Sequence, residues 1–198
     1  IQAPMGWIAR SKLASSVSNA GGLGVIETSS GEVEICKEEI KKMSDLTQNP
    51  FGVNLPILFL QDESIVDFVA ECGVKFVTTS AGSPAKYIEK LKGAGLTVYH
   101  AVPSLAGALK AAEAGVDGLV VEGTEGGGFK SPEEVGLFVL IQAIRKKVDL
   151  PIIAAGGIAD GQGMAAAFAV GAEGIQMGTR FVSSQESPVH ENWKNAIL

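Results

Sequence analysis

Histidine and cysteine are scarce in this sequence, and their scarcity excludes several kinds of active site. Its 198 residues include only two histidines and two cysteines. Cys36 and Cys72 stand far apart in no metal-ligand spacing, so we expect two reduced thiols in a cytoplasmic protein. No group of His, Asp and Glu gathers at the predicted strand ends. A metal-dependent hydrolase and a bound metal are therefore not expected.

Long apolar runs and clustered positive charge are missing as well. No run approaches 18 apolar residues, so we predict neither a membrane-spanning helix nor a membrane partner, and no signal peptide is visible. The formal net charge is −6, and the longest basic cluster, residues 145–147, is interpreted as the end of a helix. A nucleic-acid surface needs clustered Lys and Arg, so no nucleic-acid partner is expected.

Glycine is abundant, with 25 residues, and its positions are informative. Residues 122–129 read EGTEGGGF and follow an apolar run that is typical of a buried strand. An ordered glycine costs roughly 0.5–1 kcal/mol relative to alanine, and no packed core needs three in a row. Two further apolar runs, within 151–158 and 174–181, also pass directly into glycine. We therefore expect several strand ends to approach one bound ligand.

Apolar runs alternate with segments of helical periodicity along the whole chain. Segments 64–72, 85–94, 104–114, 132–147 and 161–170 are predicted helices, and glycines 73, 95, 115 and 171 are predicted to end helices. Eight such β/α units predict an α/β protein with a (β/α)8 barrel, an open doubly wound sheet being the alternative. The predicted strands are 1–4, 23–27, 51–55, 76–80, 97–101, 118–122, 151–155 and 174–177.

The length is short for this fold, of which about 250 residues are typical. A fragment that lacks the extreme N-terminus and the C-terminal part would reconcile the length with eight units. We accordingly assign residues 1–182 to the barrel. Residues 183–198 are interpreted as the start of a following segment whose remainder is missing.

Active sites of such barrels lie at the carboxyl ends of the strands. Gly156 and Gly157 after the seventh strand, and Gly178 and Thr179 after the eighth, match the usual phosphate site of the fold. Tight turns alone are the alternative explanation for each pair. Both pairs at the two expected places favour phosphate binding.

Three polar residues at strand ends have two interpretations each. Asn54 caps a turn or binds a ligand, and Glu122 is a solvated loop charge or a ligand-binding carboxylate. Gln176 lies in an otherwise apolar strand and needs a polar partner, either main chain or ligand. Met5 either forms the wall beside a flat ring or closes the barrel.

The motifs IQAPM, FGVNLPI, EGTEGGGF and PIIAAGGIADGQGMAAAFAVGAEGIQMGTRF together resemble one family. The chain is similar to the nitronate monooxygenases, also called 2-nitropropane dioxygenases, and equally to flavin-dependent enoyl-acyl-carrier-protein reductases. The resemblance covers essentially all residues. It implies a barrel with noncovalent FMN and an oxidoreductase that oxidises alkyl nitronates with dioxygen.

The resemblance also implies which residues hold the FMN. Ala3, Pro4 and Met5 would lie along the isoalloxazine ring, and Asn54 would hydrogen-bond the flavin. The remaining positions would contact the ring, the ribityl chain or the phosphate, and they are Glu122, Gly127, Gly128, Gly156, Gly157, Gln176, Met177, Gly178 and Thr179.

One departure from the family pattern concerns the catalytic base. Many members read AGGH where residues 126–129 read GGGF, and Phe129 cannot transfer a proton. Phe129 can only line a pocket or stack on a ring. His100 at a strand end is a weak substitute, since an ordinary histidine pKa of about 6.5 suits acid–base work. A hydrogen bond from His100 to main chain, and a solvated Lys130, are the preferred interpretations, so no catalytic residue is assigned.

Two further functions remain open on the sequence. An FMN reductase with NAD(P)H as co-substrate would act on enoyl thioesters or quinones, and it needs no histidine base. A non-catalytic FMN-binding module is the third possibility. In each case the partner is a small molecule. Apolar surface exposed at the top of the barrel also predicts self-association, as a homodimer.

Overall fold

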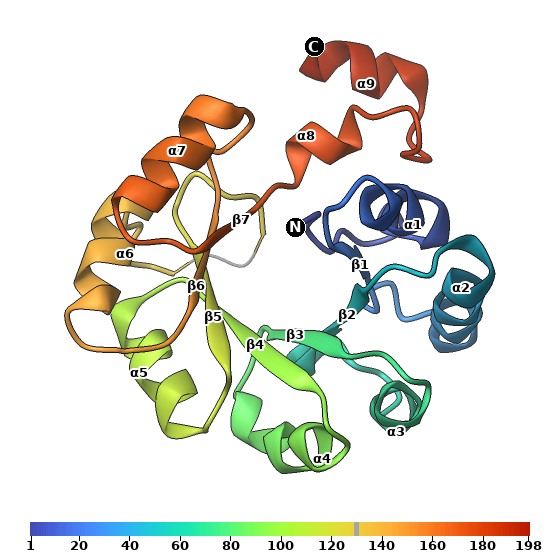
Figure 1. Ribbon diagram of the computed structural model, residues 1–198, viewed down its shortest axis with the longest axis horizontal. Helices are drawn as coiled ribbons and strands as arrows, with labels where there is room; N and C mark the ends of the chain where they lie inside the picture. Colours follow the sequence, from blue (N-terminus) through green and yellow to red (C-terminus); the bar gives the residue numbers. More distant parts are fainter. Residues whose placement is uncertain (129–130) are drawn as a thin grey trace.

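The computed structural model describes residues 1–128 and 131–198, which form a curled parallel sheet surrounded by helices (Figure 1). Each strand pairs with the next strand in the chain, in the order β1 to β7, so every connection returns through the helical layer. The barrel class predicted from the sequence is confirmed. The strands are β1 (Gly24–Ile26), β2 (Phe51–Pro56), β3 (Phe76–Ser80), β4 (Thr97–Val102), β5 (Gly118–Glu122), β6 (Ile152–Ala155) and β7 (Gly174–Gln176).

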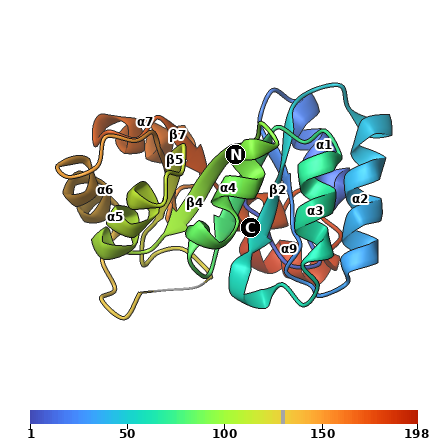
Figure 2. The same ribbon diagram turned by 90° about the horizontal axis from the view of Figure 1, so that it is seen from below.

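Helices alternate with the strands from α1 to α7, and Figure 2 shows these helices on the outside of the sheet, whereas α8 and α9 follow β7 in succession. Glycines 73, 95, 115 and 171 end α3, α4, α5 and α7 with φ angles between 80° and 105°, as predicted. The helical segments are α1 (Ser11–Asn19), α2 (Val33–Leu46), η1 (Ile57–Phe59), α3 (Ser64–Glu71), η2 (Pro84–Lys86), α4 (Ile88–Gly93), α5 (Leu105–Glu113), α6 (Leu137–Arg145), α7 (Gly161–Ala169), α8 (Thr179–Val182) and α9 (Glu191–Ile197).

Two predicted helices differ from the observed ones. The segment predicted as 132–147 becomes helical only at Leu137, because the carboxylate of Glu125 accepts hydrogen bonds from the Leu137 N–H at 3.0 and 3.2 Å. The segment predicted as 85–94 is divided into η2 and α4, which meet at Tyr87. Both differences lie at helix starts, which depend on contacts that a local pattern does not contain.

The first predicted strand, 1–4, is reduced to a single bridge in which Gln2 pairs in parallel with Met177. On the other side, the Gln2 N–H donates to the Leu23 carbonyl at 3.0 Å. The buried Gln2 side chain completes the pairing with β1: its Oε1 accepts from the Val25 N–H and its Nε2 donates to the Val25 carbonyl, each at 3.2 Å. This segment therefore closes the sheet between β7 and β1, where Figure 1 places the N-terminus.

The core has two parts. A large apolar layer lies between the sheet and the helices, and a smaller cluster fills the inside of the barrel around Val120 and Ile153. Phe76 and Tyr99 belong to the inner cluster, with ring centroids 5.2 Å apart. A Cβ at Gly118 would come within 2.3 Å of the Tyr99 ring, so glycine is required there. In the described part of the chain, no helix is both long and apolar enough to cross a membrane.

Candidate functional site at the carboxyl ends of the strands

A cavity of about 1010 Å³ lies at the carboxyl ends of the strands, above the inner cluster. Its volume is at the upper end of the range for small-molecule sites, roughly 300–1,000 Å³. All of the residues predicted from the sequence to hold a cofactor line this one cavity, and their contact with a flavin stays a prediction. They are Ala3, Pro4, Met5, Asn54, Glu122, Gly127, Gly128, Gly156, Gly157, Gln176, Met177, Gly178 and Thr179.

Main-chain N–H groups of glycines line the β5–β7 side of the cavity. Those of Gly127, Gly156, Gly157 and Gly178 donate to no acceptor among the described residues. Unpaired N–H groups need a partner, and an anionic oxygen is the acceptor that several of them can share. This side of the cavity therefore suits a phosphate group.

Turn geometry accounts for some of these glycines and not for others. Gly156 has a φ of 105°, and a Cβ there would lie 2.8 Å from the Gly126 nitrogen. A Cβ at Gly127 would meet no atom within 4 Å, and its φ is not in the left-handed region. Packing within the described residues therefore does not require glycine at 127, whereas it does at 156.

Two polar side chains follow β7 directly and face the same side. Thr179 and Arg180 line the cavity, and in the described structure neither side chain forms a hydrogen bond or an ion pair. A guanidinium group can bind phosphate oxygens in a bidentate manner. Arg180 was missed by the sequence analysis, although it follows Thr179 within the motif GIQMGTRF.

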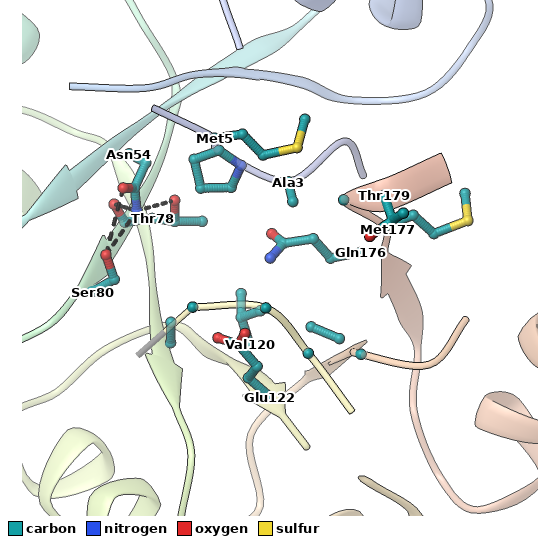
Figure 3. Close-up of a pocket in the computed structure, with 18 of the residues that line it drawn as sticks. Ala3, Met5, Asn54, Thr78, Ser80, Val120, Glu122, Gln176, Met177 and Thr179 are labelled. Atoms are coloured by element: carbon teal, nitrogen blue, oxygen red, sulfur yellow. Dashed lines mark hydrogen bonds between the residues drawn. The ribbon is translucent and has the colours of Figure 1, made fainter. Parts of the chain in front are cut away.

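The surroundings of the Gln176 amide exclude one of the two partners, main chain or ligand, that the sequence left open. This half-buried side chain lines the cavity and makes no hydrogen bond with the described part of the chain. Main chain is therefore not its partner here. In Figure 3 Gln176 lies on the same side as Thr179, across the cavity from Asn54.

Asn54 is fixed to the neighbouring strand. Its Nδ2 donates to Thr78 Oγ1 at 3.0 Å, to the Thr78 carbonyl at 3.2 Å and to Ser80 Oγ at 3.3 Å (Figure 3). Its Oδ1 has one long contact, 3.5 Å from the Ser80 hydroxyl. Asn54 thus holds β2 and β3 together at the cavity.

The glycine run after β5 folds over the carboxylate of Glu122. A Cβ at Gly126 would lie 2.6 Å from Glu122 Oε1, and one at Gly128 would lie 3.2 Å from the same atom. Glu122 lines the cavity beneath this run, as Figure 3 shows. Two of the three consecutive glycines are therefore explained in part by a neighbouring side chain.

His100 is buried in the β4 wall of the cavity. Its Nδ1 lies 2.8 Å from Thr79 Oγ1, and main-chain groups of Gly82 and Thr79 act on its pKa in the direction opposite to burial. Burial lowers the pKa of His100 to about 4. The ring is therefore neutral near pH 7 and occupied by protein partners, which favours the structural interpretation of this residue. Phe129 and Lys130 lie outside the described residues.

A fully buried carboxylate, which the sequence placed at a strand end without a role, supports the rim of the cavity. Glu27 lies 3.0 Å from the Arg10 guanidinium and accepts hydrogen bonds from the N–H groups of Trp7 at 3.2 Å, Ser29 at 2.7 Å and Ser30 at 3.1 Å. These partners belong to the two loops that carry Met5 and Ser29 to the cavity. Its position at the end of β1 was visible in the sequence, whereas its partners were not.

Comparison with known proteins assigns the family. A family model described as nitronate monooxygenase matches residues 1–64 and 60–198. This chain belongs to the nitronate monooxygenase family. A nitronate monooxygenase of Paraburkholderia phytofirmans is 30% identical over 244 residues, covering the whole chain and 67% of the relative.

Other similar proteins have different names. The (3aS,4S,5R,7aS)-5-hydroxy-7a-methyl-1-oxo-octahydro-1H-indene-4-carboxyl-CoA dehydrogenase of Rhodococcus jostii is 36% identical over 198 residues. That match covers all of this chain and 56% of the relative, so the chain spans little more than half its length. These names describe oxidoreductases with different substrates.

Solved structures of similar fold agree with this assignment. FabK from Thermotoga maritima superposes with a TM-score of 0.93 and 43% identity, over 98% of this chain and 62% of that one. Nitroalkane oxidase from Streptomyces ansochromogenes gives 0.90 and 29%, over 98% and 69%. The family therefore defines an oxidoreductase class, and it leaves the substrate open.

Proposed function

We propose that this chain forms the FMN-binding barrel of an oxidoreductase. One observation carries the proposal: unpaired glycine N–H groups, the Thr179 hydroxyl and the Arg180 guanidinium converge on one side of a single large cavity. An anionic phosphate satisfies these donors, and the remaining volume accommodates a flat ring system. Membership of the nitronate monooxygenase family supports the same cofactor.

Different residues would hold the phosphate, the ribityl chain and the ring of FMN. Gly157, Gly178, Thr179 and Arg180 would bind the phosphate, and the amide of Gln176 would bind the ribityl hydroxyl groups. Met5 and its neighbours would form the wall beside the ring. When bound, FMN supplies the two-electron chemistry that amino-acid side chains lack.

The chain's own residues position groups and exclude water, and they offer no histidine base among the described positions. The His100 ring stays neutral near pH 7, because burial lowers its pKa to about 4. The Asn54 amide nitrogen is fixed to β3, and its oxygen has one long contact, with the Ser80 hydroxyl. A reaction that depends on proton abstraction near neutral pH is thus not supported by these two residues.

Oxidation of alkyl nitronates with dioxygen is the first candidate reaction, favoured by the family description. A preformed nitronate is already deprotonated, so its oxidation does not require a base. Phe129 in place of the family histidine is compatible with this substrate and not with a neutral nitroalkane.

NAD(P)H-dependent reduction of an enoyl thioester or a quinone is the second candidate. The alignment with the CoA dehydrogenase extends over 198 residues, the length of this chain, whereas that with the nitronate monooxygenase extends over 244. The nitronate monooxygenase therefore contains residues that have no counterpart here. The higher identity to the CoA dehydrogenase, 36% against 30%, supports an acyl thioester as the second candidate.

An absorbance titration tests the cofactor and then the reaction. A protein that contains this chain is mixed with FMN, and the flavin spectrum is followed during binding. Anaerobic ethyl nitronate, NADH and NADPH are then added separately. Bleaching by nitronate alone supports the first candidate, and bleaching by a nicotinamide alone supports the second. A bound flavin that no donor bleaches would indicate a non-catalytic module, and absence of binding would contradict the proposal itself.

We also propose that the protein associates with a second copy of itself. Trp7, Leu58 and Phe59 are exposed at the rim of the cavity end, by 64%, 68% and 50%. We expect a homodimer through such apolar surface. Light scattering measures this directly, and a clean monomer at micromolar concentration would contradict it.

A further inference from the structure

We propose that Met5 is a site of reversible oxidation, at which oxygen transfer from hydrogen peroxide to the thioether sulfur weakens FMN binding. This inference rests on the proposed FMN function and adds a form of regulation to the same site. It concerns the wall formed by residues 3–6, which lines the cavity and precedes α1 in the chain.

The four methionines of the chain differ in their surroundings. Met43 is fully buried in the apolar layer, and Met164 is 39% exposed on α7, away from the cavity. Met177 lines the cavity but packs against the large apolar layer, and Figure 3 shows its side chain directed away from Gln176. Met5 lines the cavity, is partly exposed and belongs to neither apolar cluster, so a small oxidant can reach it.

The Met5 sulfur lies beside the main chain that would bind the FMN phosphate. A Cβ placed on Gly178 would be 3.7 Å from Met5 Sδ and equally far from Ala3 Cβ. The Gly178 N–H has no acceptor among the described residues, and Figure 3 shows the Met5 side chain extending toward Thr179. An oxygen atom added to this sulfur would therefore lie next to the proposed phosphate site.

Oxidation converts the soft, apolar side chain of Met5 into a polar one. The sulfoxide oxygen is a hydrogen-bond acceptor with a partial negative charge. It would compete with the phosphate for the Gly178 N–H and repel the phosphate oxygens. FMN affinity should therefore fall, whereas the fold should persist because Met5 lies outside both apolar clusters.

Hydrogen bonds fix the backbone on both sides of this sulfur. The Met5 carbonyl accepts from the N–H groups of Ile8 at 3.0 Å and Ala9 at 2.9 Å. On the other side, the Ala3 N–H donates to the Met177 carbonyl at 2.8 Å. The wall is thus tied to α1 and to β7, and it does not move aside freely to make room for an added oxygen.

Hydrogen peroxide is an oxidant that the proposed function itself can supply, because dioxygen becomes hydrogen peroxide when it takes up two electrons and two protons. The Met5 sulfur attacks one peroxide oxygen, a sulfur–oxygen bond forms and the oxygen–oxygen bond breaks. Both protons leave with the second oxygen as water. Return to the thioether consumes two thiol groups of a reductant and releases water and a disulfide.

Peptide mass spectrometry and FMN titration together test the proposal. FMN affinity is measured first, by absorbance titration of a protein that contains this chain. The protein without FMN is then treated with hydrogen peroxide, catalase removes the excess, and the sulfoxide at each methionine is quantified before the titration is repeated. We expect sulfoxide at Met5 and FMN binding that is about tenfold weaker. FMN present during the treatment should protect Met5 and not Met164.

Met5→Leu and Met164→Leu are the matched variants, because leucine has a similar volume and no oxidisable sulfur. Met164→Leu should lose FMN affinity after peroxide as the unsubstituted protein does. Met5→Leu should have the same FMN affinity before and after peroxide, whatever its starting value. The two methionine sulfoxide reductases, one for each epimer, should restore the affinity of the unsubstituted protein with dithiothreitol, and dithiothreitol alone should not.

Three results would overturn the proposal. Oxidation of Met164 without oxidation of Met5 would contradict the accessibility of the Met5 sulfur. Met5 sulfoxide with unchanged FMN affinity, or an equal loss of affinity in Met5→Leu, would contradict its effect on the cofactor. Failure of the untreated protein to bind FMN would instead contradict the proposed function, and this inference with it.

Discussion

Each glycine of the run 126–128 has its own surroundings. Gly126 and Gly128 pack against the Glu122 carboxylate, and Gly128 adopts a φ of 145°. A Cβ at Gly127 would enter open space, although its N–H lies in the cavity lining without a described partner. Within this run, a substitution of Gly127 therefore tests whether the ligand needs a glycine without disturbing the packing of the described residues.

Gly127→Ala should leave stability unchanged and weaken FMN binding, because its added methyl group would meet the ligand and no described atom. We expect an affinity loss of about tenfold, corresponding to about 1.4 kcal/mol. FMN titration and thermal unfolding measure the two effects. Gly161→Ala is the control, since its Cβ also meets nothing and it lies outside the cavity. Unchanged FMN affinity in Gly127→Ala would contradict a close approach of the flavin.

His100 should make stability depend on pH below neutrality. Its folded pKa of about 4 lies below the ordinary 6.5, so the unfolded chain binds a proton that the folded chain refuses. Stability is complete above pH 6.5 and falls as the pH drops toward 4, by up to about 3 kcal/mol from this group. Urea unfolding at pH 7.5 and 4.5 measures the difference. In His100→Gln the drop should be smaller, and an equal drop in both proteins would refute this origin.

At the scale of loops and helices, Glu27 joins segments that are distant in sequence. Its carboxylate holds the loop before α1 and the loop after β1 through main-chain N–H groups and Arg10. Trp7, one of its partners, has a φ of 60°. The rim that carries Met5 therefore depends on one buried charge.

Glu27→Ala should destabilise the protein by about 3 kcal/mol, because it leaves Arg10 without its buried partner and three N–H groups without an acceptor. FMN affinity should fall as well, since Met5 lies on the same rim. Chemical denaturation and FMN titration measure both. Glu32→Ala removes the other, half-exposed partner of Arg10 and should cost at most about 1 kcal/mol. Similar losses of stability in the two variants would contradict a larger contribution from the buried Glu27 than from the half-exposed Glu32.

The elements that the sequence predicted correctly are those defined locally. The strand patterns placed β3 and β5 at the observed residues, and the predicted residues at the strand ends line one cavity. The start of α6 was missed because its capping carboxylate, Glu125, comes from a preceding loop. Arg180 and Phe59 were missed, and Glu27 was given no role, because these roles depend on which loops meet in space.

The whole barrel is closed by a side chain that replaces a peptide group. Gln2 bridges to Met177 through its main chain and to Val25 through its side-chain amide. A period-two pattern cannot reveal such pairing, so the predicted strand 1–4 is longer than the observed bridge.

Gln2→Met should destabilise the barrel by about 2–4 kcal/mol at nearly constant volume. The Val25 N–H and carbonyl would each lose a buried hydrogen-bond partner. Urea unfolding measures the loss. The exposed Gln142 on α6, whose amide donates to a carbonyl of its own helix, is the control, and Gln142→Met should be nearly neutral. A neutral Gln2→Met would mean that closure does not depend on the side chain.

The inner cluster of Phe76, Tyr99, Val120 and Ile153 also constrains the order of events at the site. It plugs the barrel beneath the cavity, so molecules enter and leave from one side only. If the proposed reaction uses a nicotinamide and a second substrate, both must reach the same flavin through this entrance, and they cannot occupy the reacting position together. The first product must depart before the second substrate arrives, and steady-state kinetics should be ping-pong, with parallel lines in double-reciprocal plots.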